Sequence, residues 1–193
     1  MKEIKDHYFY KAKKEGYPAR SVYKLIEAQN KFKFLKPGQR ILDLGAAPGS
    51  WTKYAAKVVG PKGVVVAVDL HRLKVNMPNV FFIKDDIYEV QTDEAFKQYI
   101  PFDVILSDMA PKTTGRKDLD HYRSVDLARM ALDIASRHLT ENGSAYFKVF
   151  DGEDFPQLKR EAQELFKSVK IFKPKSSRAE SVEKFLFCQH KKK

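Results

Sequence analysis

Acidic residues lie at the ends of several apolar, strand-like runs of this sequence, and one lysine lies within such a run. Asp43, Asp69 and Asp86 lie at the ends of three successive runs, and Asp108 closes a fourth. Because the carboxyl ends of parallel strands meet at one edge of a sheet, the first three carboxylates would form a rim around a ligand. Lys148 is flanked by apolar residues, where an unpaired ammonium is costly, so it needs a partner or must lose its proton. These residues indicate a bound ligand beside a site of charge or proton chemistry.

The turn after the first run narrows the choice of ligand. The stretch "RILDLGAAPGSW", residues 40–51, is typical of a strand, a tight turn and a helix start. A dinucleotide site needs G-x-G-x-x-G, but alanine replaces the second glycine here, and the chain has no G-x-x-x-x-G-K-[ST] phosphate loop. A cofactor without phosphates, S-adenosylmethionine, fits better. Asp69, 24 residues after Gly45, is then placed for the ribose hydroxyls, and Asp86 for the adenine amino group.

Strand and helix patterns alternate beyond residue 40. Strand-like runs fall at 40–45, 63–70, 79–85, 102–109, 144–150, 168–174 and 184–190, and helical patterns at 49–58, 92–100, 121–139 and 154–167. This order predicts an α/β, Rossmann-like fold with a seven-stranded, mostly parallel sheet and helices on both faces. The short segment "KPKSSRAESVE" joins the last two runs and leaves no room for a crossover helix. These runs therefore predict a hairpin, with one antiparallel strand near the sheet edge.

Composition limits the class of protein. A chain of 193 residues, 43% of them hydrophobic, suits one compact domain. A single cysteine, Cys188, excludes an intrachain disulfide and a multi-cysteine zinc site, and predicts a buried thiol in a reducing compartment. The first residues have no apolar signal core, and no run approaches the roughly 18 apolar residues of a membrane span. We expect a soluble cytoplasmic protein without a metal.

Basic residues are concentrated near the start of the chain. The sequence has 36 Lys and Arg against 25 Asp and Glu, a formal net charge of +11 that favours a polyanionic partner. Residues 1–40 hold eleven of these basic residues and only four acidic ones, interleaved with Tyr8, Phe9, Tyr10, Tyr17 and Tyr23. Such a mixture suits phosphate contact and base stacking, although a solvated basic face over packed aromatic rings fits it equally well.

Five motifs resemble the FtsJ-type S-adenosylmethionine-dependent RNA ribose 2′-O-methyltransferases, in that family's order and spacing and over nearly the whole chain. They are "RSVYKL" (20–25), "DLGAAPGSW" (43–51), "SDMAP" (107–111), "FKVF" (147–150) and "SSRAESVE" (176–183). The resemblance implies a catalytic tetrad of Lys24, Asp108, Lys148 and Glu183. It also implies cofactor contacts at Gly49, Trp51, Asp69, Asp86 and Asp108, and we expect Gly45, which opens the turn, to bind the cofactor as well. Ser50 replaces a second glycine found in many members, at a helix start where serine is acceptable.

Methylation of a ribose hydroxyl is a displacement at a sulfonium methyl, so the attacking oxygen must be held in line and its proton removed or offset. Lys148 could act as a neutral base, or as a cation that steers the oxygen and stabilises the developing alkoxide. A nearby Lys24 favours the first role and a nearby Asp108 the second, so both stay open. Asp108 could also approach the cofactor's amino group. The stretch "SDMAP" lacks the [DN]-P-P-[YF] pattern of amino-directed methyltransferases, which favours ribose over base chemistry.

The resemblance implies an RNA target, and a uridine ribose of large-subunit ribosomal RNA fits a compact chain best. We expect residues 1–36 to form a basic, RNA-binding extension with a helix that contributes Lys24, and residues 37–193 to form the methyltransferase domain. The loop at 111–120 would also contact RNA, and the protein would act as a monomer without membrane contact. The alternatives are a transfer RNA anticodon-loop or messenger RNA cap methyltransferase, a non-catalytic RNA-binding assembly factor, and a nicotinamide oxidoreductase.

Overall fold

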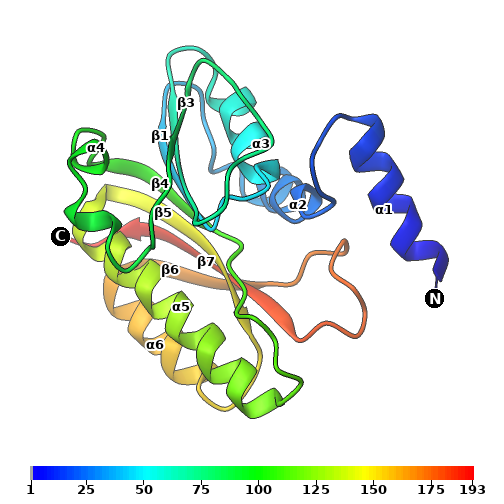
Figure 1. The fold of residues 1–193 in the computed structure, drawn as a ribbon. Helices are drawn as coiled ribbons and strands as arrows, with labels where there is room; N and C mark the ends of the chain where they lie inside the picture. Colours follow the sequence, from blue (N-terminus) through cyan, green and yellow to red (C-terminus); the bar gives the residue numbers. More distant parts are fainter. Residues whose placement is uncertain (1) are drawn as a thin grey trace.

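A seven-stranded sheet runs through the molecule (Figure 1). The structure, a computed structural model, describes the backbone of residues 2–193 and the side chains from His7 onward, so the side chains of Lys2 and Lys5 lie outside the described part. The strands have the order β3-β2-β1-β4-β5-β7-β6. Their bounds are β1 Arg40–Leu44, β2 Val64–Val68, β3 Val80–Ile83, β4 Phe102–Ser107, β5 Leu139–Phe150, β6 Phe166–Phe172 and β7 Glu183–Lys191.

The pairing of these strands confirms the predicted sheet. The five strands from β3 to β5 pair in parallel, as right-handed crossovers require. β7 pairs antiparallel with both β5 and β6, so it is the one antiparallel strand and lies next to the edge. The strand order reverses between β1 and β4, and ligands of such sheets bind at the carboxyl ends of strands beside this point.

Helices cover both faces of the sheet. The described helices are α1 Lys2–Lys14, α2 Val22–Phe32, α3 Ser50–Val59, α4 Glu94–Lys97, α5 Lys117–His138 and α6 Phe155–Leu165, with a 3-10 turn at Val90–Thr92. α2 and α3 lie on one face, and α5 and α6 on the other (Figure 1). The helix predicted at 92–100 was wrong in extent, because only Glu94–Lys97 is α-helical. Asp93 caps that turn by accepting a hydrogen bond from the Ala95 N–H at 2.6 Å.

Alternation along the strands divides the core into two layers. Leu42 and Ile105 pack toward α5 and α6, whereas Ile41 and Val104 pack toward α2 and α3. This is the period of two that an extended chain imposes on its side chains. Cys188 of β7 is fully buried in the first layer, which confirms the predicted core thiol, and burial raises the pKa of its thiol above the ordinary value.

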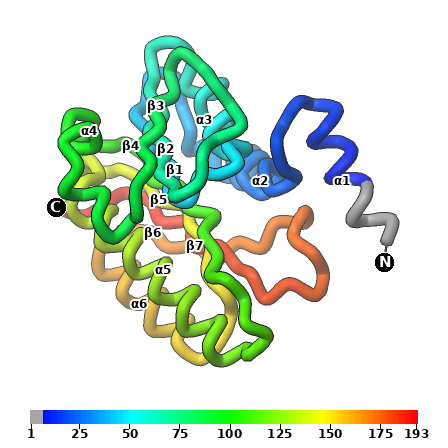
Figure 2. Tube along the Cα trace, viewed as in Figure 1, coloured from blue at the N-terminus to red at the C-terminus, as the bar shows by residue number. Residues whose placement is uncertain are grey.

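The connection from β6 to β7 projects from the sheet toward α1 and α2 (Figure 2). α1 lies beside α2 on one side of the molecule, and the end of β7 lies on the opposite side (Figure 1). The buried Ala12 of α1 packs against Val22 and Tyr23 of α2. No helix in the described part of the chain is long and apolar enough to cross a membrane.

Candidate active site

Four charged side chains from separate elements meet beside the carboxyl end of β4. Lys24 extends from α2, Asp108 follows β4, Lys148 lies in β5 and Glu183 begins β7. Lys24 Nζ lies 2.8 Å from Glu183 Oε2 and 3.6 Å from Asp108 Oδ1, and Lys148 Nζ lies 3.0 Å from the same Asp108 oxygen. The structure therefore brings together all four residues of the predicted tetrad as two cations and two carboxylates.

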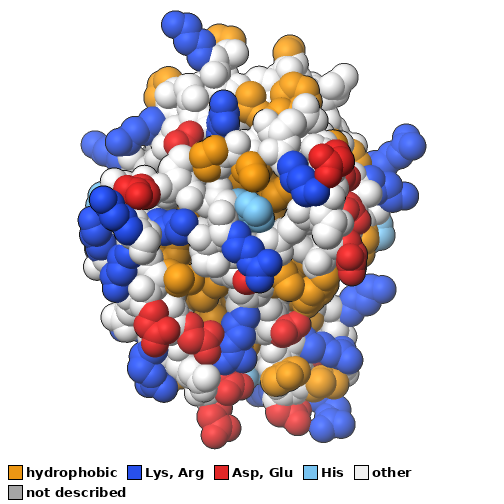
Figure 3. Space-filling view, turned by 90° about the vertical axis from the view of Figure 1, so that its left-hand side faces the viewer, with side chains coloured by type: hydrophobic (Ala, Val, Ile, Leu, Met, Phe, Trp, Pro, Cys, Tyr) orange, Lys and Arg blue, Asp and Glu red, His pale blue; other side chains and the backbone are white. Residues whose placement is uncertain are grey.

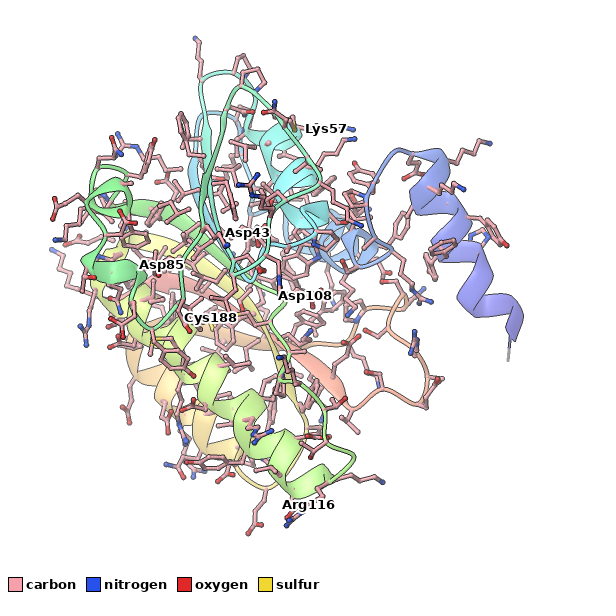
Figure 4. The ribbon with its side chains drawn as sticks, viewed as in Figure 1. Asp43, Lys57, Asp85, Asp108, Arg116 and Cys188 are labelled. Carbon is pink, nitrogen blue, oxygen red and sulfur yellow. The ribbon has the colours of Figure 1, made fainter. Side chains whose placement is uncertain are left out.

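Asp108 is the centre of this cluster, and Figure 4 shows it near the middle of the molecule. Lys148 Nζ donates a hydrogen bond of 2.6 Å to the main-chain oxygen of Asp108. The contact from Nζ to Oδ1 has an ion-pair distance but not the direction of a hydrogen bond, so the buried Oδ1 has no hydrogen-bond partner among the described residues. A buried acceptor in this state is able to receive a hydrogen bond from a bound ligand.

Three hydrogen bonds fix the start of α2, which carries Lys24. Trp51 Nε1 donates to the Ser21 carbonyl at 2.8 Å, and Tyr146 Oη donates to the Lys24 carbonyl at 3.3 Å. The Ala19 N–H donates to Ser50 Oγ at 2.7 Å. Ser50 is buried, so the residue that departs from the family pattern takes part in positioning Lys24. Sequence reasoning missed these contacts, because each joins segments that are at least 30 residues apart.

An aromatic stack lies beneath the cluster. The rings of Trp51 and Tyr146 stack at 5.5 Å, and those of Tyr146 and Phe185 at 4.9 Å. Lys24 Nζ lies 5.7 Å from the centre of the Phe185 ring. Burial raises the pKa of the Tyr146 hydroxyl well above its ordinary value, so this group stays neutral. Because the Trp51 ring is buried in the stack, only the main chain of this residue is left for the predicted cofactor contact.

The residues of the predicted cofactor rim lie in the loops that follow β1, β2 and β3. Gly45 and Gly49 have φ angles of +70° and +106°, which residues with a side chain rarely adopt. The Asp69 carboxylate accepts hydrogen bonds from the Ala47 N–H at 2.9 Å and from the His71 N–H at 2.7 Å. The half-buried Asp86, after β3, accepts one from the Tyr88 N–H at 3.1 Å. Main-chain donors thus fix both carboxylates at strand ends.

Asp43 does not belong to the exposed rim, and this part of the prediction was wrong. Asp43 is a residue of β1, and Figure 4 labels it. It is 1% exposed, and its carboxylate accepts a hydrogen bond of 2.6 Å from the Thr52 hydroxyl. Burial raises the pKa of the Asp43 carboxyl to about 7, and the charges of Asp108 and Asp69 add to the increase. Asp43 therefore holds the first turn of α3 through Thr52 and is not available to a ligand.

A carboxylate at the start of α5 orders the loop that follows Asp108. Asp120 accepts hydrogen bonds from the N–H groups of Thr114 and Gly115 and from the Thr114 hydroxyl, at 2.8 to 3.2 Å. The Thr114 N–H bond is the main cause that lowers the pKa of the Asp120 carboxyl. Within residues 7–193, no group of three or more His, Cys, Asp or Glu side chains could hold a metal ion.

The sequence of this chain is similar to a known protein family and to named relatives over most of its length. The model of the FtsJ-like methyltransferase family matches residues 17–191. The chain is 52% identical over 188 residues to the ribosomal RNA large subunit methyltransferase E of Oleidesulfovibrio alaskensis, covering 96% of this chain and 91% of that protein. It is 46% identical to the protein of the same name from Brachyspira hyodysenteriae, covering 100% of this chain and 99% of the relative.

Solved structures agree with the fold. A chain described as a ribosomal RNA methyltransferase of Plasmodium falciparum superposes with a TM-score of 0.81 at 31% identity, covering 91% of this chain and 98% of that one. Fibrillarin of Aeropyrum pernix, solved with S-adenosyl-L-methionine, has a TM-score of 0.59 at 16% identity, covering 87% of this chain and 76% of that one, and shares the fold alone. The family model and the sequence identities together show that this chain belongs to the FtsJ-like methyltransferase family.

Proposed function

We propose that the protein transfers a methyl group from S-adenosylmethionine to a ribose 2′-hydroxyl of large-subunit ribosomal RNA. The observation that carries the proposal is the charged cluster, in which Lys24, Asp108, Lys148 and Glu183 meet beside the strand-order reversal. The name of the relatives, ribosomal RNA large subunit methyltransferase E, supports the choice of RNA.

The residues at the carboxyl edge fit this cofactor. The buried Asp108 Oδ1, which has no hydrogen-bond partner among the described residues, suits the amino group of the methionyl part. The fixed carboxylate of Asp69 suits the ribose hydroxyls, and that of Asp86 suits the adenine amino group. Gly45 and Gly49 give the loop between them its tight turn. When bound, S-adenosylmethionine supplies an electrophilic methyl group on a sulfonium.

The cluster can orient and activate the attacking oxygen. Lys148 Nζ faces two acceptors, because it donates a hydrogen bond to the Asp108 carbonyl and lies 3.0 Å from the Asp108 carboxylate. We therefore assign to Lys148 the role of a cation that holds the 2′-oxygen and offsets its developing negative charge. One carboxylate of the cluster, that of Asp108 or that of Glu183, accepts the hydroxyl proton. Lys24, 2.8 Å from Glu183 Oε2, keeps that carboxylate in place.

A basic groove beside α1 supports RNA binding by the extension at residues 1–36. It has a volume of about 800 Å³, and its lining includes Tyr8, Lys11, Lys31 and Lys173. Phe9 and Tyr10 of α1 are exposed, as base stacking would need, whereas Tyr23 packs in the interior. On the side away from α1, basic and acidic side chains are intermixed (Figure 3). The charge distribution thus favours the α1 side as the RNA-binding face.

We further propose that the protein acts as a monomer in the cytoplasm, on its methyltransferase domain of residues 37–193 with Lys24 added from the extension. One chain supplies all four residues of the cluster, so the site needs no second copy.

A side-by-side assay tests the substrate. Purified protein is incubated with tritiated S-adenosylmethionine and, separately, with unmodified large ribosomal subunits or unmodified transfer RNA. We expect label in the large subunits and not in transfer RNA. Preferential labelling of the transfer RNA anticodon loop would overturn the ribosomal assignment and leave the ribose chemistry standing, and absence of transfer to either RNA would overturn the proposed function.

A further inference from the structure

A second cavity adjoins the charged cluster and is not used by the chemistry described above. It has a volume of about 220 Å³ and lies between the start of α2 and the loop from β6 to β7. Its lining includes Arg20, Lys24, Ser176, Arg178, Ser181 and Glu183. Lys24 and Glu183 belong to the charged cluster and also line this cavity, so the cavity lies directly beside the charged cluster.

The lining of this cavity suits an anion. It contains three cations, Arg20, Lys24 and Arg178, against one carboxylate, Glu183, which pairs with Lys24 at 2.8 Å. Arg178 is exposed, and no described carboxylate forms an ion pair with it. Guanidinium groups combined with hydroxyl donors are the set that proteins use for phosphate oxygens.

Ser176 gives independent evidence of a ligand. Its side chain is 2% exposed, lines the cavity, and has no hydrogen-bond partner for Oγ among the described residues. Buried hydroxyl groups in folded proteins are nearly always hydrogen-bonded, so Ser176 Oγ is available to donate a hydrogen bond to a bound acceptor.

The main chain around Ser176 is held in place. The Ser176 N–H and the Lys175 N–H donate to the two carboxylate oxygens of Glu27, at 2.9 and 2.6 Å. The Ser176 carbonyl accepts a hydrogen bond of 2.8 Å from the Arg20 guanidinium. These contacts tie the loop to α2 and hold the main chain of Ser176 in place beside the cavity, which lowers the cost of ordering the loop when a ligand binds.

We propose that this cavity binds the RNA phosphodiester on the 3′ side of the ribose that is methylated. The proposal rests on the proposed function, because it assumes a ribose at the charged cluster. The 2′-hydroxyl and the 3′-phosphate are on adjacent carbons of one ribose, so a 2′-oxygen held at Lys148 places the phosphate close to the groups around it. Lys24 and Glu183 border both positions, and Arg178 and Ser176 supply the phosphate donors.

Steady-state kinetics of the full chain test this site. Methyl transfer to unmodified large subunits is measured for wild type, Arg178→Gln, and the control Arg160→Gln, which removes an exposed arginine of α6. Removal of one charge-assisted phosphate contact in Arg178→Gln should raise KM for the subunits about tenfold and leave kcat within about twofold. The control should match wild type in both constants. Equal KM values for wild type and Arg178→Gln would overturn the proposal.

A binding measurement needs no turnover and separates this proposal from the proposed function. The amide signals of Ser176 and Ser181 are followed by nuclear magnetic resonance during titration with uridine 3′-monophosphate, uridine or inorganic phosphate. We expect saturable shifts with uridine 3′-monophosphate, weaker ones with inorganic phosphate, none with uridine, and their disappearance in Arg178→Gln. Absence of shifts with uridine 3′-monophosphate, or equal saturation by inorganic phosphate, would overturn the nucleotide assignment. If the shifts occur but wild type transfers no methyl group to RNA, the proposed function fails and the phosphate site stands.

Discussion

Replacing Asp43 by asparagine should change how the stability of this protein depends on pH. The carboxyl is fully buried, and its pKa in the folded state is about 7, against an ordinary value of 3.8. Below pH 3.8 both the folded and the unfolded chain carry the proton, so the group has no effect on stability. Between pH 3.8 and about 7 only the folded chain keeps it. The unfolded chain is then favoured progressively, and wild type loses stability as the pH rises.

The size of this loss follows from the two pKa values. One pKa unit corresponds to about 1.4 kcal/mol, so ionisation of Asp43 costs the wild-type fold about 4 kcal/mol once the pH exceeds 7. About 3 kcal/mol of this cost arises between pH 5 and pH 8. In the variant Asp43→Asn, the asparagine side chain cannot ionise but still offers an oxygen to the Thr52 hydroxyl. The variant should therefore gain about 3 kcal/mol over wild type across that interval.

Urea unfolding at pH 5 and pH 8 measures this gain. The free energies of unfolding of wild type and Asp43→Asn are compared at each pH, so the contributions of other titrating groups cancel. Asp118→Asn is the control, because it removes a carboxyl whose side chain is 74% exposed. We expect the Asp118→Asn difference to be independent of pH. If the difference between Asp43→Asn and wild type is the same at both pH values, Asp43 is already charged in the fold and the reasoning is refuted.

Three further predictions concern the active site and RNA binding. Lys148→Ala and Asp108→Ala should abolish methyl transfer while RNA binding, measured by filter retention, stays close to wild type; strong turnover in either variant would remove that residue from the chemistry. Asp69→Ala should weaken the binding of S-adenosylmethionine, measured by calorimetry, about tenfold or more, because hydrogen bonds to a charged carboxylate are removed; unchanged affinity would exclude the ribose contact. Removal of residues 1–14 should flatten the salt dependence of RNA binding, by roughly 0.7 to 0.9 in slope for each phosphate that α1 neutralises, with cofactor affinity unchanged; an unaltered slope would show that α1 binds no phosphate.

Most of the fold could be predicted from the sequence, because its strands are short apolar runs bounded by turn residues. The run at 102–109 became β4, and the hairpin was predictable from the short segment between the last two runs. The helix at 92–100 could not be limited by pattern alone, since its bounds depend on the Asp93 cap. The burial of Asp43 could not be predicted either, because the sequence near a strand end is the same whether the carboxylate faces a ligand or a neighbouring residue such as Thr52.

The candidate site was predictable in two different ways. Asp108 and Lys148 could be identified as candidates from residue type and position alone, because one is an acid at a strand end and the other a lysine within an apolar strand. Lys24 and Glu183 stood out only through the resemblance to the family, because a lysine on a helix and a glutamate after a loop are ordinary surface residues. Their place in the cluster depends on long-range contacts, such as the bond from Trp51 to the start of α2, that no local pattern encodes.

The position of the transferred methyl group tests the central claim most directly. Large-subunit RNA labelled by the protein with tritiated S-adenosylmethionine is hydrolysed in alkali, which cleaves after every nucleotide except those with a blocked 2′-hydroxyl. We expect the label to be recovered in one alkali-resistant dinucleotide with wild type and to be absent with Lys148→Ala. Recovery of the label in mononucleotides, as a methylated base, would contradict the ribose chemistry that the charged cluster is proposed to perform.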